Sequence, residues 1–230
     1  MILPKMSFIE IVNELNKDAK QLDAYIDNVI NDNKYQRIGL KHSKPYVFKP
    51  IFWTSKRNNK YFIILNTNGK KYMKKYGLLF CVWCYYTDAK NQKNGVMIIA
   101  DGTYSFFRGH LFDRYAERLL NAPSMATIDV MVKFASDTSF IVNRPFTTAY
   151  KYKDSIFATV NNGAILGTFN NGYFVYKTFI TEEMMKGSEV FYNELGQKEL
   201  EKWQKWRKDA DDIKIKMHEN SQKNLMRMAS

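Results

Sequence analysis

The stretch GHLFDRYAERLL, residues 109–120, places a histidine and two arginines at helical spacing. On a helix, His110, Arg114 and Arg118 recur every four residues and therefore share one face. A histidine can transfer a proton near neutral pH, and the guanidinium fork of arginine matches the oxygens of a phosphate group. The face has the residue types needed to act on a phosphate ester. The alternative is the solvent side of an amphipathic helix, on which Asp113 and Glu117 pair with the arginines.

This helix precedes a second helix and a run of short strands. Residues 106–181, with HLFDRYAER, ATIDVMVKF and YFVYKTFIT, resemble the small metal-independent ribonuclease domains of the RelE toxin type and their barnase-like relatives. The resemblance implies that His110 transfers the proton while Arg114 and Arg118 hold the phosphate, with Lys177 or Tyr176 completing the site. Because the RNA 2′-hydroxyl is the nucleophile, such a reaction needs no metal and no cofactor. The long N-terminal helix and the C-terminal tail have no counterpart in these domains.

The positive charge of the chain is concentrated in one tract. Between Asn33 and Thr87 there is no Asp or Glu, and the remainder of the chain balances acids and bases, so this tract accounts for the net charge of +12. It contains twelve basic residues: Lys34, Arg37, Lys41, Lys44, Lys49, Lys56, Arg57, Lys60, Lys70, Lys71, Lys74 and Lys75.

Clustered cations favour a polyanionic partner, because binding to phosphates releases counterions. We expect the tract to bind nucleic acid, preferably RNA. The predicted contacts are Lys56, Arg57, Lys60, Lys70, Lys71, Lys74 and Lys75. A solvated basic surface is the alternative. A membrane surface ranks third, because the tract lacks an amphipathic helical pattern.

The element pattern predicts an α+β protein with an antiparallel sheet core. A capping box at Ser7 and Glu10 opens a long helix, whose apolar stripe from Phe8 to Val29 should pack on the sheet or, as an alternative, on a partner helix. Aromatic and β-branched runs predict strands over 46–53, 60–67, 76–86 and 95–101, with turns at 56–59 and 66–71.

The region after the two helices, which we expect over 109–121 and 124–137, carries two Asn-Asn-Gly turns, Asn161–Gly163 and Asn170–Gly172. Asparagine and glycine tolerate the positive φ of tight hairpins, so strands over 155–160, 164–169 and 173–181 should form a β-meander, with a further strand over 147–154. Thr181 can cap a final helical arm, in which Trp203 to Met217 form an apolar seam.

The predicted regions are an N-terminal helical segment (1–40), a basic antiparallel sheet (41–103), a nuclease-like helix-helix-meander region (104–185) and a C-terminal helical arm (186–230). Cys81 and Cys84, three apart on one strand, should point to opposite faces and serve the core. With three scattered histidines we predict no metal site. The absence of a long apolar run or a signal peptide predicts no membrane association and a cytoplasmic location.

Three functions are compatible with these features. The first is an RNA-directed, metal-independent nuclease or nuclease-like protein. The second is a non-catalytic module for single-stranded nucleic acid, whose bases stack on rings such as Tyr72, Tyr76, Trp83, Tyr85 and Tyr86. The third is a structural or assembly protein of a virus or mobile element, which would associate with itself or a protein partner through the N-terminal helix or the C-terminal arm.

Overall fold

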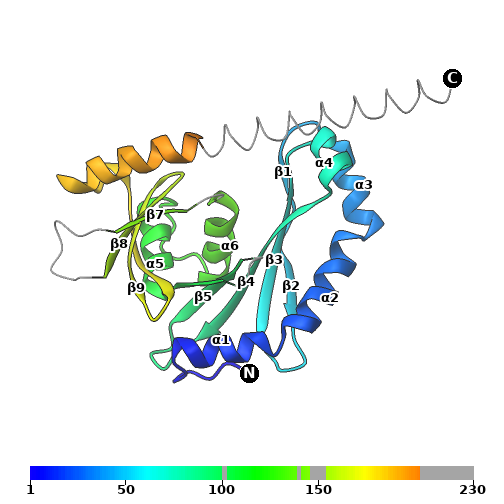
Figure 1. The fold of residues 1–230 in the computed structure, drawn as a ribbon, viewed down its shortest axis with the longest axis horizontal. Coiled ribbons are helices and arrows are strands. Elements are labelled where there is room, and N and C mark those ends of the chain that lie inside the picture. Colours follow the sequence, from blue (N-terminus) through cyan, green and yellow to red (C-terminus); the bar gives the residue numbers. More distant parts are fainter. Residues whose placement is uncertain (100–102, 139–140, 146–153, 203–230) are drawn as a thin grey trace.

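The computed structural model describes residues 1–99, 103–138, 141–145 and 154–202 (Figure 1). Within these residues one ten-stranded sheet has the order β1-β3-β4-β5-β6-β10-β9-β8-β7, and β2 also pairs with β3. The strands are β1 (Tyr46–Val47), β2 (Ile51–Thr54), β3 (Lys60–Thr67), β4 (Leu79–Thr87), β5 (Lys93–Ile98), β6 (Tyr104–Phe107), β7 (Val142–Pro145), β8 (Ser155–Val160), β9 (Gly163–Asn170) and β10 (Tyr173–Ile180). All pairs are antiparallel except β6 with β10. The predicted α+β class is confirmed.

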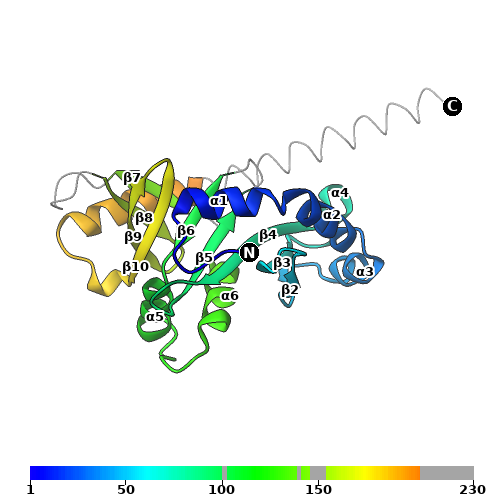
Figure 2. The ribbon, with the colours of Figure 1, turned by 90° about the horizontal axis from the view of Figure 1, so that it is seen from below.

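Helices cover both faces of the sheet (Figures 1 and 2). They are α1 (Phe8–Asn16), α2 (Ala19–Ile30), α3 (Asn33–Lys41), α4 (Lys70–Tyr76), α5 (Gly109–Arg118) and α6 (Thr127–Asp137), with a 3₁₀ turn, η1 (Glu182–Met184), and a helix over 188–202. Helices α1 and α2 pack on one face, with Tyr61, Ile63 and Leu65 of β3. Helices α5 and α6 pack on the other, with Phe62 and Ile64. Alternate residues of one strand thus belong to two cores.

The N-terminal helix is shorter than predicted. The capping box at Ser7 and Glu10 forms, and Leu15, Leu22 and Ile26 pack on the sheet as expected. The helix, however, ends at Asn16 and resumes at Ala19. Asp18 lies at the interruption with its side chain turned into the protein, where its carboxylate accepts hydrogen bonds from Asn59 Nδ2 at 2.7 Å and Tyr61 Oη at 2.8 Å. These bonds fix Asp18 on the sheet, which accounts for the break.

The basic tract is more helical than predicted. Strand β3 matches its predicted limits, but residues 46–53 divide into β1 and β2. The expected turn at 66–71 continues into helix α4, and a third helix, α3, follows the predicted end of the N-terminal helix. The sequence was expected to contain no helical pattern in this tract, and that expectation is wrong. It was the reason for ranking a membrane surface third among the possible ligands. No helix within the described residues is both long and apolar enough to span a lipid bilayer.

The second half of the chain follows its predicted order. Helices α5 and α6 precede the meander β8-β9-β10, whose Asn-Asn-Gly turns include positive φ values at Gly163, Asn171 and Gly172. Strand β6 was not predicted, and its parallel pairing with β10 joins the basic half and the meander half into one sheet. The strand predicted over 147–154 falls almost entirely outside the described residues, as does the seam from Trp203 to Met217.

Two smaller expectations concern side chains. Cys81 belongs to the core with α5 and α6, and Cys84 to the core with α1 and α2, which confirms a core role on opposite faces. Burial raises the pKa of the Cys81 thiol to about 11, so this thiol is protonated at neutral pH. Thr181 precedes η1, but its side chain makes no capping hydrogen bond.

Candidate nucleic-acid interface and the His110 helix

Eleven of the twelve cations of the acid-free tract fall into two groups at opposite ends of β3, and the twelfth, Lys49, lies between β1 and β2 (Figure 1). The first group, here called the basic corner, lies on α3, on α4 and in the loop after α3. It consists of Lys34, Arg37, Lys41, Lys44, Lys70, Lys71, Lys74 and Lys75. The second group, here called the hairpin group, lies where β2 turns into β3 and consists of Lys56, Arg57 and Lys60. Strand β3 has eight residues, so the groups are separated by roughly 26 Å.

Helix α3 presents its cations on one face. Lys34, Arg37 and Lys41 are spaced by three and four residues, and all three are exposed. The opposite side of α3 carries Gly39, which is buried against α4. A Cβ added to Gly39 would lie 2.9 Å from Met73 Sδ, so the glycine permits the close approach of the two helices.

Helix α4 completes the corner. Met73 faces inward and is 3% exposed, which leaves Lys70, Lys71 and Lys74 in solvent. Lys75 differs from these lysines, because its Nζ is buried and lies 5.3 Å from the centre of the Tyr76 ring. The turn before α4 contains Gly69, with φ of 101°, where a Cβ would come within 2.5 Å of the Ser43 carbonyl oxygen. This contact holds the loop that carries Lys44 against the start of α4.

No carboxylate neutralises the basic corner. In the part of the chain that the structure describes, none of its eight side chains forms an ion pair within 4.0 Å. Asp32, which caps α3, accepts a hydrogen bond from the Lys34 main-chain N–H at 2.7 Å, but its carboxylate forms no ion pair with the Lys34 side chain. Among the described residues, the corner therefore carries a surplus of positive charge that can attract an anionic ligand.

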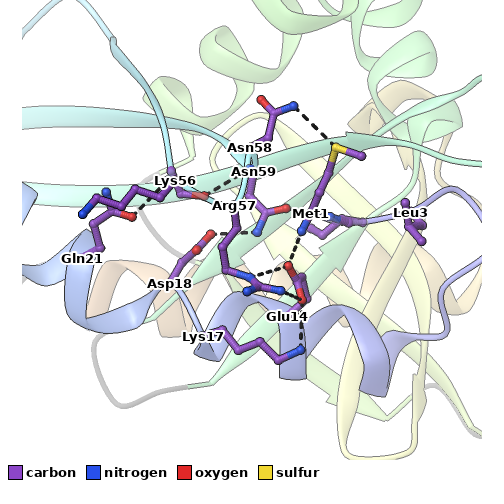
Figure 3. Close-up of polar contacts among 12 residues, drawn as sticks. Met1, Leu3, Glu14, Lys17, Asp18, Gln21, Lys56, Arg57, Asn58 and Asn59 are labelled. Atoms are coloured by element: carbon purple, nitrogen blue, oxygen red, sulfur yellow. Dashed lines mark hydrogen bonds and ion pairs between the residues drawn. The ribbon is translucent and has the colours of Figure 1, made fainter.

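The hairpin group is different, because Arg57 is already paired (Figure 3). The Glu14 side chain on α1 is 4% exposed and receives Arg57 Nε at 2.7 Å and Nη2 at 2.9 Å. Lys17 Nζ, at 3.2 Å, and the Met1 ammonium also bond to Glu14. The Arg57 hydrogen bonds hold the pKa of Glu14 well below its usual range.

A phosphate would have to compete with Glu14 for the Arg57 guanidinium, so we leave Arg57 out of the proposed interface. Lys56 and Lys60 are exposed, and the Lys56 main-chain N–H donates to Gln21 Oε1 at 3.1 Å. Both lysines lie at the far end of β3 from the other predicted contacts, which are Lys70, Lys71, Lys74 and Lys75.

The His110 face of α5 is exposed, and an acidic residue of the same helix partly neutralises its positive charge. Arg114 donates from Nε to His110 Nε2 at 3.4 Å and forms an ion pair with Glu117. Arg118 donates to the main-chain carbonyl of Phe179 on β10, so this arginine braces α5 against the sheet.

The predicted partners on β10 do not join this face. Tyr176 is 1% exposed, its hydroxyl donates to Asn143 Oδ1 at 3.0 Å, and burial raises its pKa. A β-bulge between Tyr176 and Thr178 places both Tyr176 and Phe179 in the core beneath α5. Lys177 is exposed within the bulge, and among the described residues no hydrogen bond or ion pair joins it to His110, Arg114 or Arg118. Of the predicted catalytic set, the structure brings together only His110 and Arg114.

The two candidate sites are also far from each other. Both views place α5 at one side of the molecule and α3 with α4 at the other (Figures 1 and 2). Among the rings considered for base stacking, Trp83 is 1% exposed and packs on Phe62 and Phe107 in the core. Sequence reasoning included Lys34, Arg37, Lys41 and Lys44 in the tract but not among the contacts. For Lys34, Arg37 and Lys41 the signal was the three-four spacing within NKYQRIGLK.

Comparison with known proteins adds no assignment, since no protein-family model, curated protein or solved structure matches the chain.

Proposed function

We propose that this protein binds nucleic acid through the basic corner. The observation that carries the proposal is a set of eight clustered cations on α3, α4 and the adjoining loop that has no carboxylate partner among the described residues. Lysines and arginines on short helices can follow a phosphate backbone, and each contact gains free energy from counterion release. RNA is the preferred ligand because residues 106–181 resemble metal-independent ribonuclease domains.

The test compares two variants of equal charge. In one, Lys70, Lys71 and Lys74 of the corner are replaced by Gln; in the other, the exposed Lys20, Lys93 and Lys198 are replaced. Fluorescence anisotropy with a labelled RNA strand should show that the corner variant binds on the order of 30-fold more weakly than wild type, while the control stays within about threefold. Equal losses in the two variants would show that net charge alone attracts the strand.

An anionic membrane surface is the competing ligand for the same cations. Co-sedimentation with phosphatidylserine vesicles, in the same buffer, provides the comparison. Nucleic-acid binding is supported when the strand displaces the protein from vesicles. Retention on vesicles without measurable strand affinity would refute it.

Metal-independent RNA cleavage at His110 is the second candidate. It is favoured by the exposed imidazole, whose Nε2 lies 3.4 Å from Arg114 Nε. RNA incubated in EDTA should be cut by wild type and spared by His110→Ala, while Lys198→Ala, which changes an exposed residue of the helix over 188–202, should cut as wild type does. Equal, negligible cleavage by all three proteins would remove this candidate and leave the binding proposal intact.

A further inference from the structure

A groove of about 940 Å³ opens next to the basic corner. Its walls come from β1 with the ends of β3 and β4, from the tip of the β5–β6 hairpin, and from α6 with β7 and β10. Residues that represent these walls are Val47, Asn66, Phe80, Ile99, Asn143 and Phe174.

The wall formed by β4 exists because the neighbouring strand is shorter. Pairing between β4 and β5 begins at Val82 with Ile98, so Leu79, Phe80 and Cys81 are paired only with β3. Phe80 is 43% exposed, Val47 46% and Ile99 40%. These side chains do not share one face, because the register pairs Phe80 with Leu65 and Val47 with Asn66, so the groove is lined from both faces of the sheet. Exposed apolar side chains that line a concavity mark a ligand-binding surface.

The groove is continuous with the basic corner along the chain. Pro45, in its wall, directly follows Lys44; Asn68 precedes Lys70 by two residues; and Leu78 follows Lys75 by three. A strand whose phosphates contact the corner therefore has its bases within reach of the groove. The cations that neighbour the groove in the chain could bind the phosphates of a nucleotide, and the largely apolar lining of the groove could receive its base.

Polar groups in the groove suit the edges of bases. The side-chain amides of Asn66 and Asn68 make no hydrogen bond within the described residues, and both line the groove. Asn143 uses its Oδ1 to accept from Tyr176, which leaves its NH₂ group as a donor. Amides of this kind pair with base edges, whereas bases stacked inside a duplex cannot enter a groove.

We propose that this groove receives unpaired bases of a single strand whose phosphates lie on the basic corner. The inference rests on the proposed function and narrows its ligand to single-stranded nucleic acid. Phe80 is the central contact, because an exposed ring at the groove wall offers a face for base stacking.

The experiment combines a protein change with a ligand change. Wild type, Phe80→Ala and the control Phe191→Ala, whose ring is 58% exposed on the helix over 188–202, are titrated with three ligands. These are a 12-nucleotide strand carrying 2-aminopurine, the same strand with abasic central positions, and the duplex of the same sequence. The abasic strand keeps every phosphate and removes only the bases.

Wild type should bind the intact strand roughly tenfold more tightly than the abasic strand, and 2-aminopurine fluorescence should fall on binding. Phe80→Ala should lose most of this preference while its affinity for duplex is unchanged, and Phe191→Ala should behave as wild type. The loss of affinity caused by Phe80→Ala and the loss caused by removing the bases should not add, because both changes remove the same contact between ring and base.

Three results would overturn the inference. They are an equal loss of affinity for strand and duplex in Phe80→Ala, no loss of affinity for either ligand, and 2-aminopurine fluorescence that does not change on binding. If the corner variant still loses affinity in those cases, the proposed function stands and only the groove is excluded. If the corner variant also binds normally, both proposals fall.

Discussion

Cations from one acid-free tract have two different environments in this protein. Arg57, in the hairpin group, is fixed by two hydrogen bonds to Glu14, a residue 43 positions away on α1. The eight cations of the basic corner have no carboxylate partner among the described residues. The comparison shows that composition identifies a surplus of charge, whereas the fold decides which charges remain available to a ligand.

Because Arg57 is paired and the basic corner is not, mutations in the two regions should affect different properties, namely stability and binding. A buried carboxylate paired with arginine contributes to stability, since removing one partner leaves the other charge uncompensated. Exposed cations of one sign repel each other, so their removal should be neutral or slightly stabilising. Changes in the Glu14 network should therefore lower the free energy of unfolding, and changes in the corner should lower affinity.

The largest effect is expected for Glu14→Ala. Glu14 is buried, but its partners Arg57, Lys17 and the Met1 ammonium are about half exposed, so we expect a loss of about 2 kcal/mol in the free energy of unfolding, measured by urea denaturation. Glu117→Ala removes an exposed pair with Arg114 and should cost less than about 1 kcal/mol. Similar losses in both variants would show that the Glu14 network is no more than a surface ion pair.

The same network predicts a pH dependence. The pKa of Glu14 is lowered in the folded protein, so its stabilisation is present above the unfolded pKa of about 4.3 and is lost as the pH falls below that value. The difference in unfolding free energy between wild type and Glu14→Gln should be constant from pH 7 to pH 5 and shrink towards pH 3. A difference that grows on acidification would contradict this assignment.

Gly39→Val tests the geometry of the corner. The new side chain would meet Met73 Sδ, so α3 and α4 must separate, with a cost of about 1–2 kcal/mol and a several-fold loss of strand affinity. Adding Met73→Ala should restore part of the affinity because it opens space for valine. Unchanged affinity in a destabilised Gly39→Val protein would mean that the relative position of the two helices does not matter for binding.

The smallest effect is expected in the remaining hairpin lysines. Replacing Lys56 and Lys60 by Gln should change strand affinity less than about threefold, since these residues lie roughly 26 Å from the corner. Replacing Lys70 and Lys74 by Gln serves as the matched double variant. Equivalent losses would extend the interface along the whole of β3.

Local patterns in the sequence were sufficient for some elements. The capping box at Ser7 and the Asn-Asn-Gly turns of the meander are short-range signals, and both formed as predicted. The apolar run at residues 60–67 likewise predicted the limits of β3 correctly. Each of these depends on residues close together in the chain.

Other features depend on distant residues. The break at Asp18 requires Asn59 and Tyr61, and the parallel pairing of β6 with β10 joins strands on either side of two helices. Helix α4 has only one buried residue, Met73, and follows an Asn-Gly pair typical of a turn.

The candidate site was predictable in part for the same reason. The acid-free tract was visible in the composition, but the pairing of Arg57 with Glu14 and the assembly of α3 with α4 through Gly39 are tertiary contacts. The His110 helix and its pairing of Arg114 with Glu117 were expected from spacing alone. The β-bulge beside Lys177 was not expected, because nothing in the local sequence marks it.

The salt dependence of strand affinity tests the central claim most directly. Plotted as log affinity against log salt concentration, wild type should have a steep negative slope, and replacing Lys70, Lys71 and Lys74 by Gln should reduce its magnitude by about two, near 0.7 for each lost phosphate contact on a single strand. The Lys20, Lys93 and Lys198 variant should keep the wild-type slope. Parallel lines for wild type and the corner variant would contradict the claim that these lysines contact phosphate.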